Sequence, residues 1–146
     1  MKARKRKLKK MGPILFAVIF LVVVLPLVAV KAMAYTEDDL YNLEHLICGE
    51  AEGCSWDMKI SVGSVVLNRV DDERFPDKIA EVIFQEGQYS CTWDGNFYKE
   101  PSSETKEAAL YLLENGSQID KSVVWQAEFI QGTGVYDVIG NMYFCY

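Results

Sequence analysis

The chain has 146 residues, of which 50% are hydrophobic and 25% charged, so it is neither disordered nor of low complexity and has room for one compact domain. Its charge is distributed unevenly. Seven of the 15 Lys and Arg residues lie in the first ten positions, whereas all 21 Asp and Glu residues follow position 34. The last 112 residues therefore carry a net charge of −14. A surface this acidic repels phosphate backbones, which argues against nucleic-acid binding.

Residues 1–34 have the pattern of an export signal. A basic stretch ending at Lys10 is followed by an uncharged run at 14–30 and by Lys-Ala-Met-Ala at 31–34, an ending that signal peptidase accepts. The run of 17 residues is long for a signal peptide, so an uncleaved anchor is the alternative. Both interpretations predict that residues 35–146 form a secreted, extracytoplasmic domain, with membrane contact only through the N-terminal segment.

Four cysteines follow the export signal: Cys48, Cys54, Cys91 and Cys145. An even number of cysteines in an exported chain predicts two disulfides, although the sequence leaves the pairing open. The alternatives are free buried thiols, a zinc site that recruits His45, or a thiol nucleophile. The spacing between the first two cysteines is wider than zinc ligands usually have.

Two helices are predicted at the start of the domain. Thr36 is followed by three acids, which is typical of a helix start because threonine caps the helix and the acids face the positive end of its dipole. Apolar residues at helical spacing continue from there, and Gly53 is the expected terminator. Ser55 is expected to cap a second helix with a valine-rich face ending near residue 70. We interpret Arg69, which with Asn68 ends this helix, as an ordinary C-terminal cation; support of the functional site is the alternative.

A short third helix is expected to begin at Pro76, because proline suits the first helical position, and to end near Phe84. Residues 85–101 are aromatic, polar and glycine-containing, without a sustained period. A segment of this length is too long for a simple connector in a small domain, and loops of this kind often carry function.

A last helix is expected from Ser102 or Ser103 to the Asn-Gly pair at 115–116, which is a clear stop signal. Beyond it, residues 122–130 and 135–143 are rich in β-branched and aromatic residues and flank a Gly-Thr-Gly turn, which predicts a hairpin. The sequence therefore predicts one mainly α domain of the α+β class, with a short β or irregular C-terminal part.

The residue inventory limits the chemistry that an exported enzyme of this sequence can use. A single histidine, His45, excludes zinc hydrolases that need two or three imidazoles, and the sequence has neither a phosphate-binding glycine loop nor an EF-hand pattern. We therefore predict no metal and no cofactor, and expect carboxylates to carry any catalysis.

Among the acids, Glu50 stands out as a candidate general acid. It continues the apolar stripe of Leu40, Leu43 and Ile47, so it is expected on the core-facing side of the first helix, near the C-terminal end. Desolvation and the helix dipole both disfavour a negative charge there and favour the protonated carboxyl. That is the form that protonates a glycosidic oxygen. The alternative is a partly exposed glutamate at the helix end.

Five segments together resemble the cell-wall hydrolase family of the spore-cortex-lytic enzymes SleB and CwlJ. Each segment alone is weakly specific, but the five occur in the order and spacing of the family over about residues 43–144. They are Cys-Gly-Glu-Ala-Glu-Gly at 48–53, Val-Gly-Ser-Val-Val-Leu-Asn-Arg-Val at 62–70, Phe-Pro at 75–76, Gln-Glu-Gly-Gln-Tyr-Ser at 85–90 and Ile-Gly-Asn-Met-Tyr-Phe at 139–144.

The resemblance implies a small lysozyme-like catalytic domain that acts on bacterial peptidoglycan. The catalytic glutamate of the family is the first one of its Glu-Ala-x-Gly motif, and this falls on Glu50, the residue already selected from the helix pattern. The chain departs from the family pattern where Glu52 replaces an arginine, Cys54 an acid, Glu86 a proline and Met142 a histidine.

The resemblance also suggests a mechanism. Glu50 is expected to protonate the oxygen between N-acetylmuramic acid and N-acetylglucosamine. Lysozyme-like domains with one glutamate commonly act as lytic transglycosylases, in which the sugar's own 6-hydroxyl closes a 1,6-anhydro ring. A hydrolase in which Asp94 or Glu52 activates water is the near alternative, because water attack usually recruits a second carboxylate.

Four further residues are predicted to contact saccharide: Gln88 and Tyr89 in the long loop, and Asn141 and Tyr143 near the C-terminus. Amides and aromatic rings suit sugar hydroxyls and ring faces, and local packing is the alternative for each residue.

Two other functional classes are compatible with the sequence. The first is a glycan-binding module without catalysis. The second is an N-acetylmuramoyl-L-alanine amidase, although the single histidine argues against a zinc-dependent one.

Overall fold

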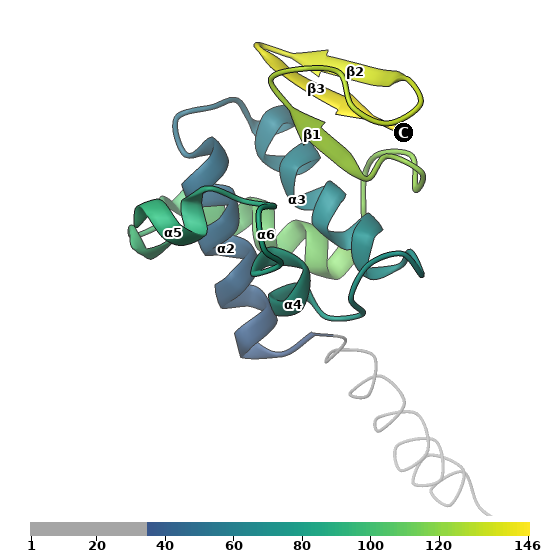
Figure 1. Ribbon diagram of the computed structural model, residues 1–146. Coiled ribbons are helices and arrows are strands. Elements are labelled where there is room, and N and C mark those ends of the chain that lie inside the picture. Colours follow the sequence, from purple (N-terminus) through teal and green to yellow (C-terminus); the bar gives the residue numbers. More distant parts are fainter. Residues whose placement is uncertain (1–34) are drawn as a thin grey trace, which may run out of the picture. The chain divides into compact units, whose positions relative to one another are not determined.

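The computed structural model describes residues 35–146, so the predicted signal peptide or anchor at 1–34 lies outside the described residues. Helices make up about half of the described residues, and a small antiparallel sheet lies over α3 (Figure 1). In chain order the elements are α2 (Glu37–Ala51), α3 (Trp56–Val70), α4 (Ile79–Ile83), α5 (Cys91–Asp94), the 3-10 helix η1 (Asn96–Tyr98), α6 (Ser103–Asn115), β1 (Trp125–Ala127), β2 (Val135–Ile139) and β3 (Met142–Cys145). The predicted α+β class is confirmed. Between residues 35 and 146, no helix is both long enough and apolar enough to cross a membrane.

The long helices begin where the sequence predicts. Thr36 forms a capping box with Asp39, because the threonine Oγ1 accepts from the Asp39 amide at 3.1 Å and the Asp39 carboxylate accepts from the Thr36 amide at 2.9 Å. Ser55 and Ser102 each accept a hydrogen bond from the backbone amide three residues on, at the starts of α3 and α6. Each cap satisfies a backbone amide that would otherwise lack a partner in the first turn.

The short elements differ from the predictions. The third helix begins at Ile79 and not at Pro76, because Lys78 has an extended backbone (φ −130°, ψ 141°). The segment 85–101, predicted as a loop, contains α5 and η1, which are separated by Gly95 at φ +89°. Helices of three or four residues are too short to leave a periodic pattern in the sequence.

The C-terminal sheet has the order β1-β3-β2, and the predicted hairpin was wrong. The observed hairpin joins β2 to β3 through the two residues Gly140 and Asn141, with Ile139 opposite Met142. Gly140 has φ +60°, a conformation that two-residue hairpin loops require and glycine adopts without strain. β1 pairs with β3 from its other side, so the predicted turn at 132–134 does not link two paired strands.

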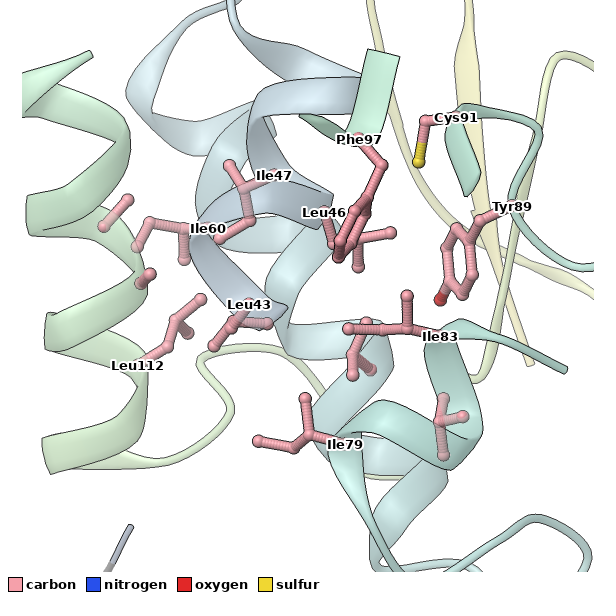
Figure 2. Packing of buried hydrophobic residues seen from close by; sticks show 14 residues of the cluster. Leu43, Leu46, Ile47, Ile60, Ile79, Ile83, Tyr89, Cys91, Phe97 and Leu112 are labelled. Atoms are coloured by element: carbon pink, nitrogen blue, oxygen red, sulfur yellow. The ribbon is translucent and has the colours of Figure 1, made fainter. Parts of the chain in front are cut away.

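The helices pack around one main hydrophobic core, seen in Figure 2. α2, α3, α4 and α6 supply aliphatic side chains, and the segment after α4 adds Tyr89, Cys91 and Phe97. Gly63 allows α3 to approach its neighbours closely, since a Cβ at this position would overlap Leu112 and lie 3.0 Å from the Ile47 Cδ1. A second, smaller cluster joins α3 to the C-terminal part: Ala51, Met58, Val62, Val65, Val123 and Phe144.

Arg69 is not an ordinary helix-end cation but is buried, with 3% of its surface exposed. Its Nε donates to the Val124 carbonyl at 2.7 Å, and an Nη1 donates to the Tyr89 hydroxyl at 3.4 Å. The guanidinium carbon lies 5.1 to 5.5 Å from the ring centres of Phe75, Tyr89 and Trp125. Arg69 thus links the end of α3 to the segment before α5 and to the sheet.

Candidate active site

Glu50 lies in the last turn of α2, as the helix pattern predicts. Leu43 and Ile47 on the same stripe are fully buried, whereas Glu50 itself is half-buried. The carboxylate therefore sits at the boundary between the core and solvent. A carboxyl at such a boundary can reach a substrate while keeping apolar neighbours on one side.

The segment that carries α5 packs against this end of α2. Burial raises the pKa of the Cys91 thiol, and the carboxylate of Glu50 raises it further. Burial also raises the pKa of Tyr89 to about 12, and the charge of Glu50 again contributes. Gly49, the residue before Glu50, packs directly against Cys91 at the start of α5, so Glu50 lies next to the segment predicted to carry function.

The four predicted saccharide contacts are divided between two places. Gln88 is half-buried beside α5, in a turn that its backbone amide closes on the Gln85 carbonyl at 3.2 Å. Asn141 is exposed in the β2–β3 turn and donates to the Glu128 carboxylate at 2.6 Å. Tyr143 is half-buried in β3, opposite Ala127. Asn141 and Tyr143 thus belong to the sheet, which packs on α3 through β1.

Tyr89 is a core residue in this structure, with 2% of its surface exposed. Its ring lies in the hydrophobic cluster of the helices, and its hydroxyl accepts from Arg69. A ring buried this deeply offers no face to a sugar, so the structure does not support the predicted saccharide contact of Tyr89. Local packing, the alternative considered for Tyr89, describes its position.

Glu52, one of two candidates for a second carboxylate that activates water, is hydrogen-bonded to the start of α6. Its carboxylate accepts from the Ser102 amide at 3.1 Å and from the Thr105 hydroxyl at 2.7 Å. Burial acts to raise the pKa of Glu52, but hydrogen bonds from Ser102, Thr105 and Cys48 outweigh it, so the pKa is lowered overall. Glu52 thereby holds the start of α6 against the end of α2.

Asp94, the other candidate, closes the turn after α5. It accepts from the Asn96 amide and from the Asn96 side chain, both at 2.8 Å. Both candidates for the activation of water are thus engaged in hydrogen bonds with other parts of the protein.

We expect Glu52→Gln to destabilise the fold by about 1 kcal/mol at neutral pH, because a neutral amide is a weaker acceptor than a carboxylate. Since the folded-state pKa of Glu52 is lowered, its contribution is fully present above its ordinary value of 4.5 and is lost as the pH falls through the folded value. Thermal unfolding of the unmodified chain and the variant at pH 7 and pH 3 tests this. The unfolding midpoints of the two proteins should differ at pH 7 and converge at pH 3. The same difference between midpoints at both pH values would contradict the role of the Glu52 charge.

All four cysteines are free thiols, so the two predicted disulfides are not formed. Cys48 lies 3.8 Å from the Lys99 carbonyl, Cys91 packs beside Gly49, Cys145 is buried in the central strand, and Cys54 is exposed. The four side chains lie in different surroundings, which an even count of cysteines does not reveal.

His45 is also buried, and its Nδ1 lies 2.6 Å from the Phe97 carbonyl. Its ring stacks on Tyr41, with 4.1 Å between ring centres. In the part of the chain that the structure describes, no three His, Cys, Asp or Glu side chains are grouped as metal ligands.

A surface cavity of about 670 Å³ lies at the C-terminal end of α3. Glu50 is near the other end of α3, because a short loop at 52–55 joins α2 to the start of α3. The cavity is thus distinct from the surroundings of Glu50. Its lining residues are Asn68, Asp71, Asp72, Glu73, Arg74 and Lys121.

Comparison with known proteins defines the family. Residues 55–145 match the Cell Wall Hydrolase family, so the chain belongs to this family. The matched range begins five residues after Glu50.

Curated relatives include a spore cortex-lytic enzyme of Oceanobacillus iheyensis, 32% identical over 76 residues, which are 52% of this chain and 28% of the relative. Another is a spore cortex-lytic enzyme of Bacillus subtilis, 25% identical over 117 residues, which are 76% of this chain and 38% of the relative. The chain thus spans between about a quarter and two fifths of these two relatives.

Solved structures with the same fold include the catalytic domain of the Bacillus cereus SleB protein, with a TM-score of 0.68, 23% identity and coverage of 77% of this chain and 92% of the other. The catalytic domain of a germination-specific lytic transglycosylase SleB from Bacillus anthracis gives a TM-score of 0.66 at 24% identity, covering 77% and 97% of the two chains. The lysozyme-like α+β fold is therefore confirmed.

Proposed function

We propose that this chain is a secreted lytic transglycosylase that cleaves the bond between N-acetylmuramic acid and N-acetylglucosamine in peptidoglycan, with Glu50 as general acid and base. Membership of the Cell Wall Hydrolase family supports peptidoglycan as the substrate. Both curated relatives bear the name of spore cortex-lytic enzymes, and this supports action outside the cytoplasm.

One observation carries the assignment of Glu50: its carboxylate is half-buried at the end of α2, beside the loop that bears α5. The position leaves one side open to a glycan and places buried groups on the other. The sequence pattern and the family resemblance select the same residue.

In the proposed reaction, the Glu50 carboxyl gives its proton to the glycosidic oxygen, and N-acetylglucosamine leaves as the alcohol. The C1–O bond of N-acetylmuramic acid breaks through an oxocarbenium-like state. The 6-hydroxyl of the same sugar then bonds to C1, and its proton passes to the Glu50 carboxylate. The product is a 1,6-anhydro ring, no water is consumed, and Glu50 is protonated again.

Ring closure is favoured over attack by water because the two candidate carboxylates are engaged elsewhere. Glu52 holds the start of α6, and Asp94 closes the turn at Asn96. A hydrolase of this type usually needs a second carboxylate to activate water, whereas ring closure does not. The structural neighbour from Bacillus anthracis is itself described as a lytic transglycosylase.

Mass spectrometry of the products tests this function. The purified full chain is incubated with peptidoglycan from vegetative walls and, in parallel, from spore cortex. Anhydromuramyl ends on the released muropeptides are the expected result. Reducing ends, which are heavier by one water, would contradict the ring closure, and free peptide amines would indicate an amidase. Binding to the wall without any product would indicate a glycan-binding module.

A further inference from the structure

The cavity at the C-terminal end of α3 has no part in the proposed reaction, yet its lining is highly polar. Its volume is about 670 Å³, and it is lined by three carboxylates, two cations and one buried amide. Most of these residues belong to the end of α3 and the turn after it, and Lys121 comes from the segment before β1. Two separate parts of the chain thus meet at the cavity, and the chemistry of their side chains determines what it can bind.

Asn68 is the buried amide of this lining, with 1% of its surface exposed. Its Nδ2 donates to the carbonyls of Asp120 and Val123, at 2.8 and 2.9 Å, so both amide hydrogens are used. Turning the amide around is ruled out, because a carbonyl cannot donate to the Asn68 oxygen. The Oδ1 accepts no hydrogen bond from any residue between 35 and 146. Buried polar atoms nearly always have a partner, so this oxygen is a free acceptor at the cavity.

The charged side chains of the lining also leave an acceptor unused. Asp72 is bound by Arg74, whose Nε and Nη2 donate to its two oxygens at 2.9 and 2.7 Å and hold the pKa of Asp72 at about 2. Asp71 lies 3.6 Å from the Lys121 Nζ, and both side chains are exposed. Glu73 has no ion pair with any cation in the described part of the chain. The lining groups that lack a partner are therefore hydrogen-bond acceptors.

An ammonium group matches such a lining, because it brings a positive charge and three N–H donors. A metal ion fits less well, since residues 35–146 contain no three ligating side chains grouped around one point. We propose that the cavity binds the ammonium group of a peptidoglycan stem peptide. Glu73 and Asp71 supply the opposite charge, and the Asn68 Oδ1 supplies the neutral acceptor. The identity of the ligand rests on the proposed function, because free amino groups occur on the peptides that join the glycan strands of peptidoglycan.

The cavity lies far from the bond that the proposed reaction breaks. α3 has 15 residues and is about 22 Å long, with the cavity at its C-terminal end and Glu50 near its other end. A small substrate does not reach both places, whereas a network of strands joined by peptides does. Binding at the cavity holds the protein on the wall equally before and during the reaction. It therefore acts on KM and leaves kcat unchanged.

Kinetics on two forms of the wall test the site, with three variants of the full chain. Glu73→Gln should raise KM about two- to fivefold at unchanged kcat, which is the usual effect of one exposed ion pair. Lys121→Gln should lower KM, because it frees Asp71 for the ligand. Glu107→Gln is the matched control, since Glu107 is an exposed acid of α6 outside the cavity, and it should change neither constant.

The same measurements on a wall whose amino groups have been acetylated identify the group that is bound. The unmodified chain and Glu73→Gln should then have equal KM values, because the acetylated amine has lost its charge. If Glu73→Gln behaves like Glu107→Gln on the untreated wall, the proposal is overturned. A rise in KM for Glu73→Gln that persists on the acetylated wall would also overturn it, since the amine would not be the group recognised.

A binding experiment separates this proposal from the proposed function. The full chain, labelled with nitrogen-15, is titrated with the stem tripeptide L-Ala-γ-D-Glu-meso-diaminopimelate and, in parallel, with its fully N-acetylated form. We expect the side-chain amide resonances of Asn68 to shift with the free tripeptide and not with the acetylated one. Such a shift in a chain that releases no muropeptides would support the cavity and remove the proposed function. Cleavage of the wall by a chain whose Asn68 resonances stay unshifted would overturn the role of the cavity alone.

Discussion

Replacing Glu50 by Gln is expected to lower the rate of wall cleavage by about two to four orders of magnitude, which is the usual contribution of a general acid and base. Gln has the size and shape of Glu but cannot give up a proton to the glycosidic oxygen. Because Glu50 is only half-buried, the substitution should change the free energy of unfolding by less than about 0.5 kcal/mol. Release of soluble muropeptides measures the rate, and thermal unfolding measures the stability.

Glu52→Gln is the matched control for this experiment, because it is the same substitution two residues along the chain. Glu52 holds the start of α6 rather than facing the loop with α5. The two variants should therefore have opposite effects: Glu50→Gln loses activity and keeps stability, while Glu52→Gln loses stability and keeps activity per folded molecule. Activity that survives in Glu50→Gln and disappears in Glu52→Gln would reverse the assignment.

Arg69→Ala should have the largest effect on stability, about 3 kcal/mol, which corresponds to a fall of roughly 10 °C or more in the unfolding midpoint. The substitution leaves the buried Val124 carbonyl without its donor and removes a cation from the faces of three rings. It also leaves a cavity between α3 and the sheet, because the arginine is buried. Thermal unfolding by circular dichroism measures the midpoint.

Arg74→Ala is the control for Arg69→Ala. Like Arg69, Arg74 has its guanidinium near the ring of Phe75, but its side chain is exposed. Its partner Asp72 is bonded to it at 2.7 Å, but exposed pairs of this kind add little to stability. The midpoint of Arg74→Ala should therefore stay close to that of the unmodified chain. Equal midpoints for the two arginine variants would mean that the buried guanidinium does not link α3 to the sheet.

The long helices could be predicted from sequence because their starts are encoded by local contacts. Thr36, Ser55 and Ser102 each cap a backbone amide three residues away, so their effect does not depend on the rest of the fold. The strand pairing could not be predicted in the same way. The sequence offers two glycine turns in the C-terminal part, and the tighter one at Gly140 forms the hairpin. Gly132 instead lies so close to the Tyr146 carbonyl that a Cβ at this position would overlap it.

In the candidate site, too, features that depend on local sequence could be predicted, whereas features that depend on distant contacts could not. Glu50 could be found because its place depends on the period of one helix and on a short motif around it. Tyr89 and Cys91 could not be placed, because their burial depends on Arg69 and Gly49, residues about 20 and 42 positions away in the sequence. Cys91 directly follows the Gln-Glu-Gly-Gln-Tyr-Ser segment that resembles the family loop, and it packs in the core of the helices. The count of four cysteines instead suggested a disulfide.

Digestion in water labelled with oxygen-18 distinguishes ring closure directed by Glu50 from attack by water on the sugar. The full chain and Glu50→Gln are incubated in parallel with purified peptidoglycan in the labelled water, and the released muropeptides are weighed by mass spectrometry. We expect 1,6-anhydro products without the heavy isotope from the unmodified chain, and no product above background from Glu50→Gln. Muropeptides carrying one oxygen-18 at a new reducing end would show that water attacks the sugar, and they would contradict the proposed ring closure.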